Sequence, residues 1–407
     1  MTRLSRIHPY PAMIADDLAM ELGRQFVKPG QRVLDPFCGT GRTLLAAAEF
    51  GAECVGLDIN PLATFLTCAK SGNPRVDVLE NFLLNAPARF NDLTVPVRDL
   101  EFGRKVEWFS RASKIELSAL INWINESNLD SDELKIVAAL LSATAREVSY
   151  CRQDGWKLHR ISPKARKRLS ASAGEVFKRR LRVALRDLTN AKRPSGSFRI
   201  ITGDARNLCH LLGPDEQHQG VDLVITSPPY GDSRTTVQYG AMSGLCLGVL
   251  RHLHRLNIDV ITGGEIDRRC LGGAPLEDSR SKRDPFFCRS CYWYGGLENP
   301  CLKLVRRFLE DIELSCREIS KVLRRGGRAV FIVARRSIGG WRLKLDRFLI
   351  DTLTRWHLLF EGMCIREISG KIVPLQINKQ GHAKTKQPLS SRVATMRAEY
   401  VMAFRKA

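Results

Sequence analysis

Two acidic residues and two glycines stand near the start of the chain in a pattern that suits ligand binding. In segment 33–41 (VLDPFCGTG), Asp35 ends an apolar run, and Gly39 and Gly41 follow where the chain must turn sharply. Asp58 ends the next apolar run, where a carboxylate can hold the two hydroxyl groups of a ribose. The pattern predicts a loop that lays a nucleoside-containing ligand against the backbone.

This loop lacks the features that bind a pyrophosphate. It has neither the third glycine of the dinucleotide fingerprint nor the Gly-Lys-Ser/Thr of a P-loop. S-adenosylmethionine fits such a loop, with Asp35 facing its positively charged methionine end and Asp58 its ribose. Segment 203–205 (GDA), after a later strand, is expected at the adenine edge. The alternative is an ordinary tight turn between a strand and a helix.

A second motif, segment 224–231 (VITSPPYG), places two prolines at the end of an apolar strand. The Ser227 hydroxyl and the Pro228 carbonyl can accept both hydrogens of an exocyclic amino group, and Tyr230 offers a flat face on which a base can stack. A nucleobase amine is a poor nucleophile because its lone pair is delocalised, and such hydrogen bonds localise the lone pair and aim it. The motif therefore predicts attack by a base amine, although a loop stiffened by prolines would look the same.

Alternating strands and helices surround both motifs. Short apolar runs predict strands at 31–35, 53–58, 198–202, 221–226, 328–333 and 400–404. Helices are expected at 42–50 and at 302–325, the latter ending at Gly326-Gly327 before the next strand. This order predicts an α/β fold with an open, mostly parallel sheet covered by helices on both faces.

Two segments interrupt the alternation. Residues 75–195 are helical in composition, and residues 251–301 are an irregular stretch rich in Gly, Arg and Cys. Within the first, residues 146–193 hold 15 Lys or Arg against four acids, about half of the formal net charge of +21. A basic excess of this kind is typical of contact with phosphates, and the alternative is a solvated helix face.

The composition excludes several classes of protein. The start of the chain has no apolar signal region, and no run approaches the ~20 apolar residues of a membrane span, so we expect a cytoplasmic protein without membrane contact. The twelve cysteines are scattered and are expected to be reduced. A zinc knuckle could involve Cys270, Cys288, Cys291 and Cys301. Only one pair has metal-ligand spacing, so thiols without metal are the favoured interpretation.

Together, segments 35–41 (DPFCGTG) and 226–230 (TSPPY) resemble the amino-methylating DNA methyltransferases, which use S-adenosylmethionine to methylate cytosine N4 or adenine N6. Segment 8–14 (HPYPAMI) resembles the part of this family that closes over the methionine end of the cofactor. Segment 231–240 resembles an extension seen in members with Ser-Pro-Pro-Tyr, and segments 368–374 and 396–406 also match. The resemblance implies a Rossmann-like class I methyltransferase fold.

The resemblance also implies roles for individual residues. The catalytic residues would be Ser227, Pro228, Pro229 and Tyr230. The cofactor-binding residues would be Tyr10, Pro11, Asp35, Pro36, Phe37, Cys38, Gly39, Gly41, Asp58, Asn60, Asp204 and Ala205. Duplex DNA would contact the basic region through Arg152, Lys157, Arg160, Lys164, Arg166, Lys167, Arg168, Arg179 and Arg180.

The expected division separates the blocks that carry the resemblance from the two insertions, which do not carry it. Residues 1–74, 196–250 and 302–407 would form the catalytic domain, residues 75–195 a DNA-binding part, and residues 251–301 a target-recognition part. The basic segment precedes the strand at 198–202, whereas a recognition region would usually follow it, so we assign it to DNA binding.

The expected substrate is a base flipped out of double-stranded DNA in a prokaryotic nucleoid, with a cognate restriction endonuclease as a further candidate partner. Ser227 in place of Asp favours cytosine N4 over adenine N6. One rival is an RNA or tRNA guanine-N2 methyltransferase, which usually has Asp-Pro-Pro-Tyr and an N-terminal RNA-binding domain. The other is a non-catalytic nucleic-acid-binding protein that keeps the fold.

Overall fold

The computed structural model of the 407-residue chain places most of the sequence. It describes residues 4, 6–92, 94–100, 106–153, 158–166, 171–191, 195–214, 219–231, 238–273, 302–338, 341–368, 376–377, 393–394 and 398–407. Predictions that concern Lys157, Lys167, Arg168, segment 232–237, most of segment 251–301 and residues 369–374 therefore lie outside the described residues.

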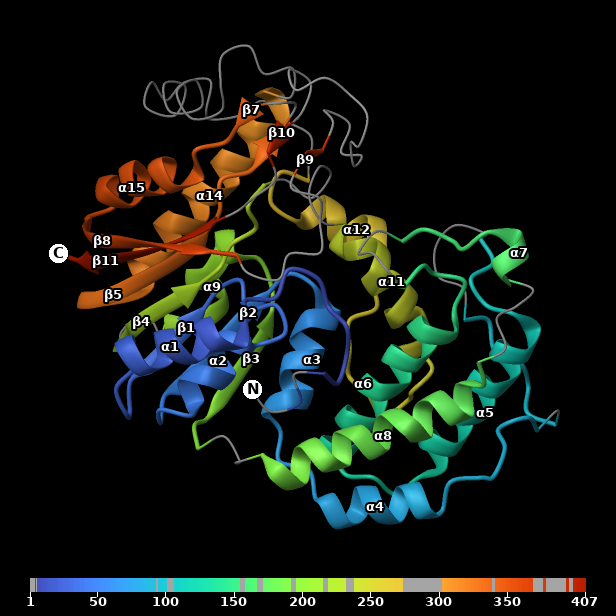
Figure 1. Ribbon diagram of the computed structural model, residues 1–407. Coiled ribbons are helices and arrows are strands. Elements are labelled where there is room, and N and C mark those ends of the chain that lie inside the picture. Colours follow the sequence, from blue (N-terminus) through green and yellow to red (C-terminus); the bar gives the residue numbers. More distant parts are fainter. Residues whose placement is uncertain are drawn as a thin grey trace.

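The described residues form a seven-stranded sheet in the order β3-β2-β1-β4-β5-β11-β8 (Figure 1). Its strands are β1 (Arg32–Asp35), β2 (Glu53–Asp58), β3 (Phe198–Thr202), β4 (Val221–Thr226), β5 (Leu323–Val333), β8 (Leu358–Glu367) and β11 (Ala398–Lys406). The first five in spatial order run parallel, and β11 runs antiparallel to both β5 and β8. The strand order reverses between β1 and β4, which leaves a crevice beyond their carboxyl ends. The predicted Rossmann-like α/β fold is confirmed.

Helices cover both faces of the sheet. On one face lie α1 (Asp16–Phe26) and α2 (Arg42–Ala48), and on the other lie α9 (Leu208–Leu212), α14 (Leu302–Val322) and α15 (Leu345–Arg355). Successive residues of β4 face opposite sides of the sheet, since Leu223 packs with α1 and α2 while Val224 packs with α14. Burial on both sides explains why these strands read as continuous apolar runs.

The predicted helix at 302–325 ends earlier than expected, and this prediction was wrong at its C-terminal end. Helix α14 stops at Val322, and β5 already begins at Leu323, which pairs with Val221 of β4. The next paired residue of β5 is Arg328, opposite Leu223, so residues 324–327 bulge out of the ladder. Gly326, at φ 72°, makes this bulge possible because left-handed backbone favours glycine.

The helical part of the chain forms one apolar core, distinct from the two cores that flank the sheet. It contains α3 (Pro61–Ser71), α4 (Val76–Leu84), α5 (Arg111–Glu126), α6 (Ser131–Val148), α7 (Pro163–Arg166), α8 (Ala173–Asn190), α11 (Tyr239–Leu250) and α12 (Gly263–Arg269). The central helix α6 packs against α3, α8 and α11 (Figure 1). Segment 75–195 is therefore joined to its neighbours on both sides by packing.

Segment 251–301 was expected to be irregular, and its described portion, residues 251–273, corrects that in one place. Helix α12 forms there, with the Thr262 side chain accepting a hydrogen bond from the backbone N–H of Glu265 as its N-cap. Gly263 at its start touches the backbone of Gly240 in α11, where a Cβ on either residue would clash.

The smaller paired strands are β6 (Ser337–Ile338) with β7 (Trp341–Arg342), and β9 (Gln376–Ile377) with β10 (Val393–Ala394). Among the described residues, no helix combines the length and apolar character needed to cross a membrane.

Candidate active site

A cavity of about 270 Å³ lies at the carboxyl ends of the parallel strands and brings both predicted motifs together. The predicted cofactor residues that line it are Tyr10, Pro11, Asp35, Pro36, Phe37, Cys38, Gly39, Asp58, Asn60, Asp204 and Ala205. All four predicted catalytic residues, Ser227, Pro228, Pro229 and Tyr230, line it as well. Residues separated by nearly 200 positions in the sequence thus share one site.

Gly41 is the exception among the predicted cofactor residues, because it does not line the cavity. It precedes α2 in left-handed backbone, at φ 78°, and a Cβ there would lie 2.5 Å from the side chain of Thr67. Its part in the site is to let the loop turn tightly against α3.

The cofactor loop is held from both sides by hydrogen bonds. The backbone N–H of Gly39 donates to Asp58 Oδ2 over 2.9 Å, which joins the loop to the end of β2. From α3, Thr67 Oγ1 donates to the Gly39 carbonyl over 2.9 Å, and Lys70 Nζ donates to the Thr40 carbonyl over 3.0 Å. The loop is therefore set in one conformation before any ligand arrives.

Asp35 is a buried carboxylate whose hydrogen-bond donors are all neutral. Its Oδ1 accepts from Thr226 Oγ1 over 2.7 Å and from the Phe37 N–H over 3.1 Å, and its Oδ2 accepts a short hydrogen bond from Thr43 Oγ1. Burial raises the pKa of Asp35 to about 6, and these hydrogen bonds oppose the rise. A positively charged ligand would stabilise the ionised form.

Asp58 has a similar environment at the end of β2. It accepts from the backbone N–H of Gly39 and from that of Asn60, each over 2.9 Å, and burial raises its pKa to about 6. A carboxylate offers about four acceptor positions, so about two remain for the hydroxyls of a ribose. These two carboxylates fit S-adenosylmethionine, which carries both a positive charge and a ribose.

Asn60 and Tyr10 act together at the edge of the cavity. Asn60 Nδ2 donates to Tyr10 Oη over 2.9 Å and to Ser243 Oγ of α11 over 2.8 Å, and the Tyr10 ring stacks on that of Tyr239. The amide thereby fixes the N-terminal segment that was expected to cover the methionine end. Tyr239, on α11, lines the cavity too. It lies within segment 231–240, but its place in the cavity was missed because it depends on how α11 packs.

Cys38 lies in the loop but has no features of a nucleophile. Its thiol is buried, and burial raises its pKa well above the ordinary value. Among the predicted zinc ligands, Cys270 borders the cavity, while Cys288, Cys291 and Cys301 lie outside the described residues. Across the residues that the structure does describe, no group of three metal-binding side chains comes together.

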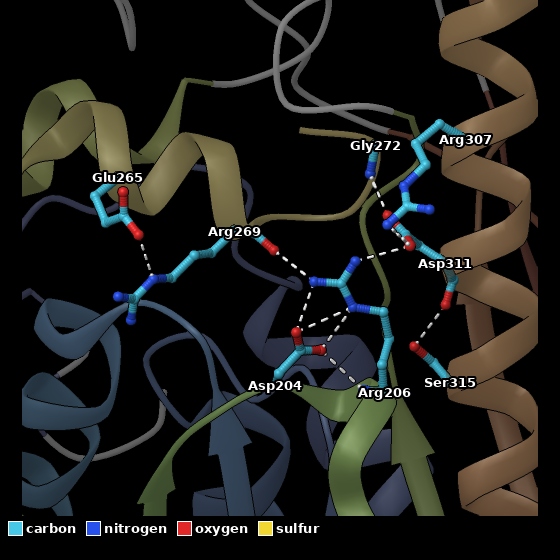
Figure 2. A network of polar contacts seen from close by, with 8 residues as sticks. All are labelled: Asp204, Arg206, Glu265, Arg269, Gly272, Arg307, Asp311 and Ser315. Atoms are coloured by element: carbon cyan, nitrogen blue, oxygen red, sulfur yellow. Dashed lines mark hydrogen bonds and ion pairs between the residues drawn. The ribbon is translucent and has the colours of Figure 1, made fainter. Parts of the chain in front are cut away.

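At the end of the cavity that was predicted to hold adenine, Asp204 follows β3 and begins a short 3₁₀ helix, η1 (Ala205–Asn207). Its carboxylate accepts from the backbone N–H of Arg206 over 2.9 Å and from the guanidinium of the same residue (Figure 2). That guanidinium also contacts Asp311 of α14 and the carbonyl of Arg269. Nothing in the residue spacing predicts this network, because its members come from three distant segments.

The catalytic motif forms a chain of hydrogen bonds. Ser227 Oγ lies 3.1 Å from Tyr230 Oη, and Tyr230 Oη donates to Glu399 Oε1 over 3.3 Å. Burial raises the pKa of Tyr230, with the charge of Glu399 adding to the rise, so the phenol stays protonated at neutral pH. Glu399, on β11, lines the cavity and pairs with Arg366 over 3.4 Å. Sequence reasoning missed it because the residues around it form an ordinary strand.

The predicted DNA-binding residues differ in their surroundings. Arg152, Arg160 and Lys164 are exposed, and an isolated bridge between Cys151 and Arg160 brings the first two close together. The guanidinium of Arg166 lies over the ring of Tyr150, 5.3 Å from its centre. Arg179 and Arg180 of α8 instead both pair with Glu147, over 2.5 and 2.6 Å. Part of the positive charge of α8 is therefore neutralised within the protein.

Comparison with known proteins agrees with this site. A family model described as DNA methylase matches residues 3–64. The chain is similar to the Type II methyltransferase M.MvaI of Kocuria varians, with 27% identity over 425 residues that cover 97% of this chain and 91% of the relative. It is also similar to the Type II methyltransferase M.BsoBI of Geobacillus stearothermophilus, with 24% identity over 157 residues, 36% of this chain and 29% of the relative.

Among solved structures, a TehB-like SAM-dependent methyltransferase from Corynebacterium glutamicum matches with 10% identity and a TM-score of 0.31, over 98% of this chain and 90% of that one. The sequence relatives confirm the predicted resemblance to the DNA amino-methyltransferases. The expected cofactor, S-adenosylmethionine, agrees with the methyltransferase names of these relatives.

Proposed function

We propose that this chain, a DNA methyltransferase that depends on S-adenosylmethionine, methylates cytosine N4 in double-stranded DNA at a specific sequence. The observation that carries the proposal is the shared cavity, in which Ser227 and Tyr230 face the same space as Asp35 and Asp58. Adenine N6 is the alternative target. The serine at position 227, where the other common form of the motif has aspartate, favours cytosine.

The residues of the cofactor loop hold and orient the cofactor in this proposal. When bound, S-adenosylmethionine supplies an electrophilic methyl group. Asp58 accepts hydrogen bonds from the ribose, and Asp35 contributes negative potential near the sulfonium and ammonium charges. Asn60 holds Tyr10 over the methionine end through the hydrogen bond described above.

The catalytic motif binds the target amine. A base inside the duplex cannot bring its amino group to the methyl, so it must be flipped out, and the ring of Tyr230 stacks on it. Ser227 Oγ and the Pro228 carbonyl accept the two amino hydrogens, which localises the nitrogen lone pair and directs it in line with the methyl. After transfer, the nitrogen loses one proton to water, and no nucleophilic side chain is required.

We assign DNA binding to segment 75–195 and target recognition to segment 251–301, as parts added to a catalytic domain of residues 1–74, 196–250 and 302–407. Exposed Arg152, Arg160 and Lys164 suit contacts with the phosphates of duplex DNA. The described residues Arg269 and Leu271 support the second assignment, because they bring segment 251–301 to the cavity wall. Since this substrate is chromosomal, we place the protein in the prokaryotic cytoplasm with the nucleoid.

The experiment uses radiolabelled S-adenosylmethionine with duplex DNA or with RNA. Wild-type protein is expected to label DNA, whereas S227A and Y230A lose transfer yet bind the cofactor nearly as before. S127A, at a serine that caps the end of α5 far from the cavity motifs, is the matched control. Label in RNA alone would favour the RNA methyltransferase, and label in neither would favour a non-catalytic protein.

Modification-sensitive sequencing of DNA from cells that express the chain identifies both the base and its sequence context. N4-methylcytosine at one recurrent sequence supports the proposal, and N6-methyladenine would replace it with the alternative. By analogy with its Type II relatives, a companion endonuclease is expected to be blocked by this modification. Digestion of the same DNA with candidate endonucleases tests that partner.

A further inference from the structure

Arg206 lies directly behind the adenine end of the cavity, at the centre of the polar network in Figure 2. Its side chain is 16% exposed, and its guanidinium has three partners. Nη2 donates to Asp204 Oδ2 over 2.6 Å and to the Arg269 carbonyl over 2.9 Å, while Nη1 pairs with Asp311 Oδ1 over 2.7 Å. Each partner belongs to a different segment of the chain.

We propose that Arg206 is a positioning residue that makes the cofactor site selective for a 6-aminopurine ring. The proposal rests on the placement of Asp204 at the adenine edge, which is part of the proposed function. Arg206 itself does not line the cavity, so it acts through its neighbours.

The first step concerns the acceptor positions of Asp204. Oδ1 accepts from the backbone N–H and from Nε of Arg206, each over 2.9 Å, and Oδ2 accepts from Nη2 over 2.6 Å and from the same Nε, shared between the two oxygens, over 3.0 Å. Of the roughly four acceptor positions on a carboxylate, these donors occupy about three. The forked contact also fixes the plane of the carboxylate, as paired contacts between Arg and carboxylates do.

The remaining acceptor position discriminates between purines. An amino group on the purine can donate a hydrogen bond to Asp204, whereas a carbonyl oxygen at the same position would face a negatively charged acceptor. A site built around a buried hydrogen bond rejects an analogue that lacks the donor much more strongly than an apolar pocket does. Selectivity therefore requires the carboxylate to be held in place, which is the role of the guanidinium.

The second step concerns the wall of the cavity. Arg206 holds the Arg269 carbonyl, and Asp311 Oδ2 accepts from the backbone N–H of Gly272 over 2.8 Å (Figure 2). Between these two anchors lie Cys270 and Leu271, which line the cavity. The same guanidinium thus fixes the carboxylate and one wall beside it.

The charge of Arg206 is permanent in this environment. Burial by itself would lower its pKa, but the hydrogen bond with Asp204 and the charge of Asp311 outweigh burial and raise it. A lysine at this position would keep the charge but lose the fork that contacts Asp204 and Asp311 together. R206K therefore separates the geometry from the charge.

Arg307 provides a matched control within the same network. Its Nη2 lies 3.3 Å from Asp311 Oδ1 and its Nη1 lies 3.4 Å from Glu310 Oε2, with 24% of the side chain exposed. Among the described residues its ion pairs are with Glu310 and Asp311, and none reaches Asp204 or the cavity wall at 269–271. R307Q should therefore weaken the network and the stability of the fold without releasing the carboxylate.

The test measures dissociation constants of S-adenosylhomocysteine and S-inosylhomocysteine by calorimetry on the full chain, as wild type, R206K, R206Q and R307Q. The two ligands differ at position 6 of the purine, which carries an amino group or a carbonyl, and at N1, which is an acceptor in adenine and an N–H donor in hypoxanthine. Wild type is expected to prefer the adenosyl ligand by roughly 100-fold or more. In both Arg206 variants the preference should fall at least about tenfold, while R307Q keeps it within about twofold.

Thermal unfolding of each variant is followed in parallel, and R206K, which keeps the charge, is the variant expected to stay folded. An unchanged preference in folded R206K, or an equal loss in R307Q, would overturn the role of Arg206. Equal binding of both ligands by wild type would overturn the placement of Asp204 and the inference with it. DNA labelling by the same wild-type preparation shows separately whether the proposed methyl transfer stands.

Discussion

The ammonium group of Lys70 lies 3.0 Å from the carbonyl oxygen of Thr40, in a position where only 1% of the lysine is exposed. One turn earlier on α3, Thr67 donates to the carbonyl of Gly39. Two consecutive carbonyls of the cofactor loop are therefore held by one helix. Burial lowers the pKa of Lys70 to about 7, with the nearby charge of Arg42 lowering it further and Asp16 opposing.

Replacing Lys70 with Met should flatten the pH dependence of stability. Between pH 7 and 10.5 the unfolded chain binds a proton on this lysine that the folded chain does not, so the free energy of unfolding rises with pH. The contribution of one group is at most about 1.4 kcal/mol per pH unit. Urea unfolding at pH 7, 8 and 9 should show a smaller slope for K70M than for wild type.

The control for this prediction is K135M, since Lys135 is partly exposed and pairs with Asp132 at the surface. It should leave the slope as it is in wild type. Equal slopes for wild type and K70M would show that the buried lysine does not release its proton on folding.

The burial of His8 predicts a loss of stability at the acid end of the pH range. The imidazole is buried between Ser142 Oγ, 3.0 Å from Nε2, and the Pro9 carbonyl, 2.8 Å from Nδ1. Burial lowers its pKa to about 3. Between pH 6.5 and 3 the unfolded chain binds a proton that the folded chain excludes, so stability falls as the pH is lowered.

Replacing His8 with Gln should remove that part of the acid sensitivity. The urea midpoint of H8Q is expected to change less between pH 7 and pH 5 than that of wild type. H254Q, at an exposed histidine, should behave as wild type does. If H8Q and wild type lose stability in parallel, protonation of His8 does not limit the fold in acid.

The sequence was sufficient to predict the two motif loops and the five parallel strands that carry them, but not the edge strand β8. Asp35 and Asp58 end strands, and the glycines and prolines that follow are residues with strong local preferences, so local chemistry and chain direction determine where they lie. The same holds for β4, whose apolar run reflects burial on both faces. The local conformational preferences of the residues are therefore enough to predict those parts of the site that lie at strand ends.

The rest of the site depends on packing between distant segments. Tyr239 and Glu399 reach the cavity from α11 and β11. Both lie in segments that resemble the family, but the resemblance assigned neither residue a role. Helix α6 forms one core with α3 and α11, so the boundary expected near residue 75 does not separate two cores. Such contacts are decided by tertiary structure, and a single sequence carries no direct signal for them.

Cofactor binding should weaken in acid because of Asp58. With a pKa of about 6, this carboxyl becomes protonated below that pH and loses acceptor capacity for the ribose hydroxyls. Asp35 has a pKa of about 6 as well, so affinity can fall by up to about 100-fold per pH unit when both titrate. Calorimetry with S-adenosylhomocysteine from pH 7.5 to 5 measures this slope.

D58N should bind more weakly at pH 7.5 and should show about half of the wild-type slope, because only Asp35 then titrates in the site. D92N serves as the control, since Asp92 is exposed and its hydrogen-bond partner among the described residues is Thr94. A wild-type affinity that stays constant from pH 7.5 to 5 would contradict the assignment of Asp58 to the ribose.

Exposed basic residues and ion-paired basic residues of this segment should contribute differently to DNA binding. R160Q and K164Q are each expected to weaken binding to any duplex and to reduce the slope of log K against log salt by about one, with little change in thermal stability. Arg180 is 21% exposed and pairs with Glu147. R180Q should therefore mainly lower thermal stability and leave the salt slope nearly unchanged. Fluorescence anisotropy at several salt concentrations measures the slope for each variant. A full unit of slope lost in R180Q, with none lost in R160Q or K164Q, would place the DNA on α8 instead of beside α7.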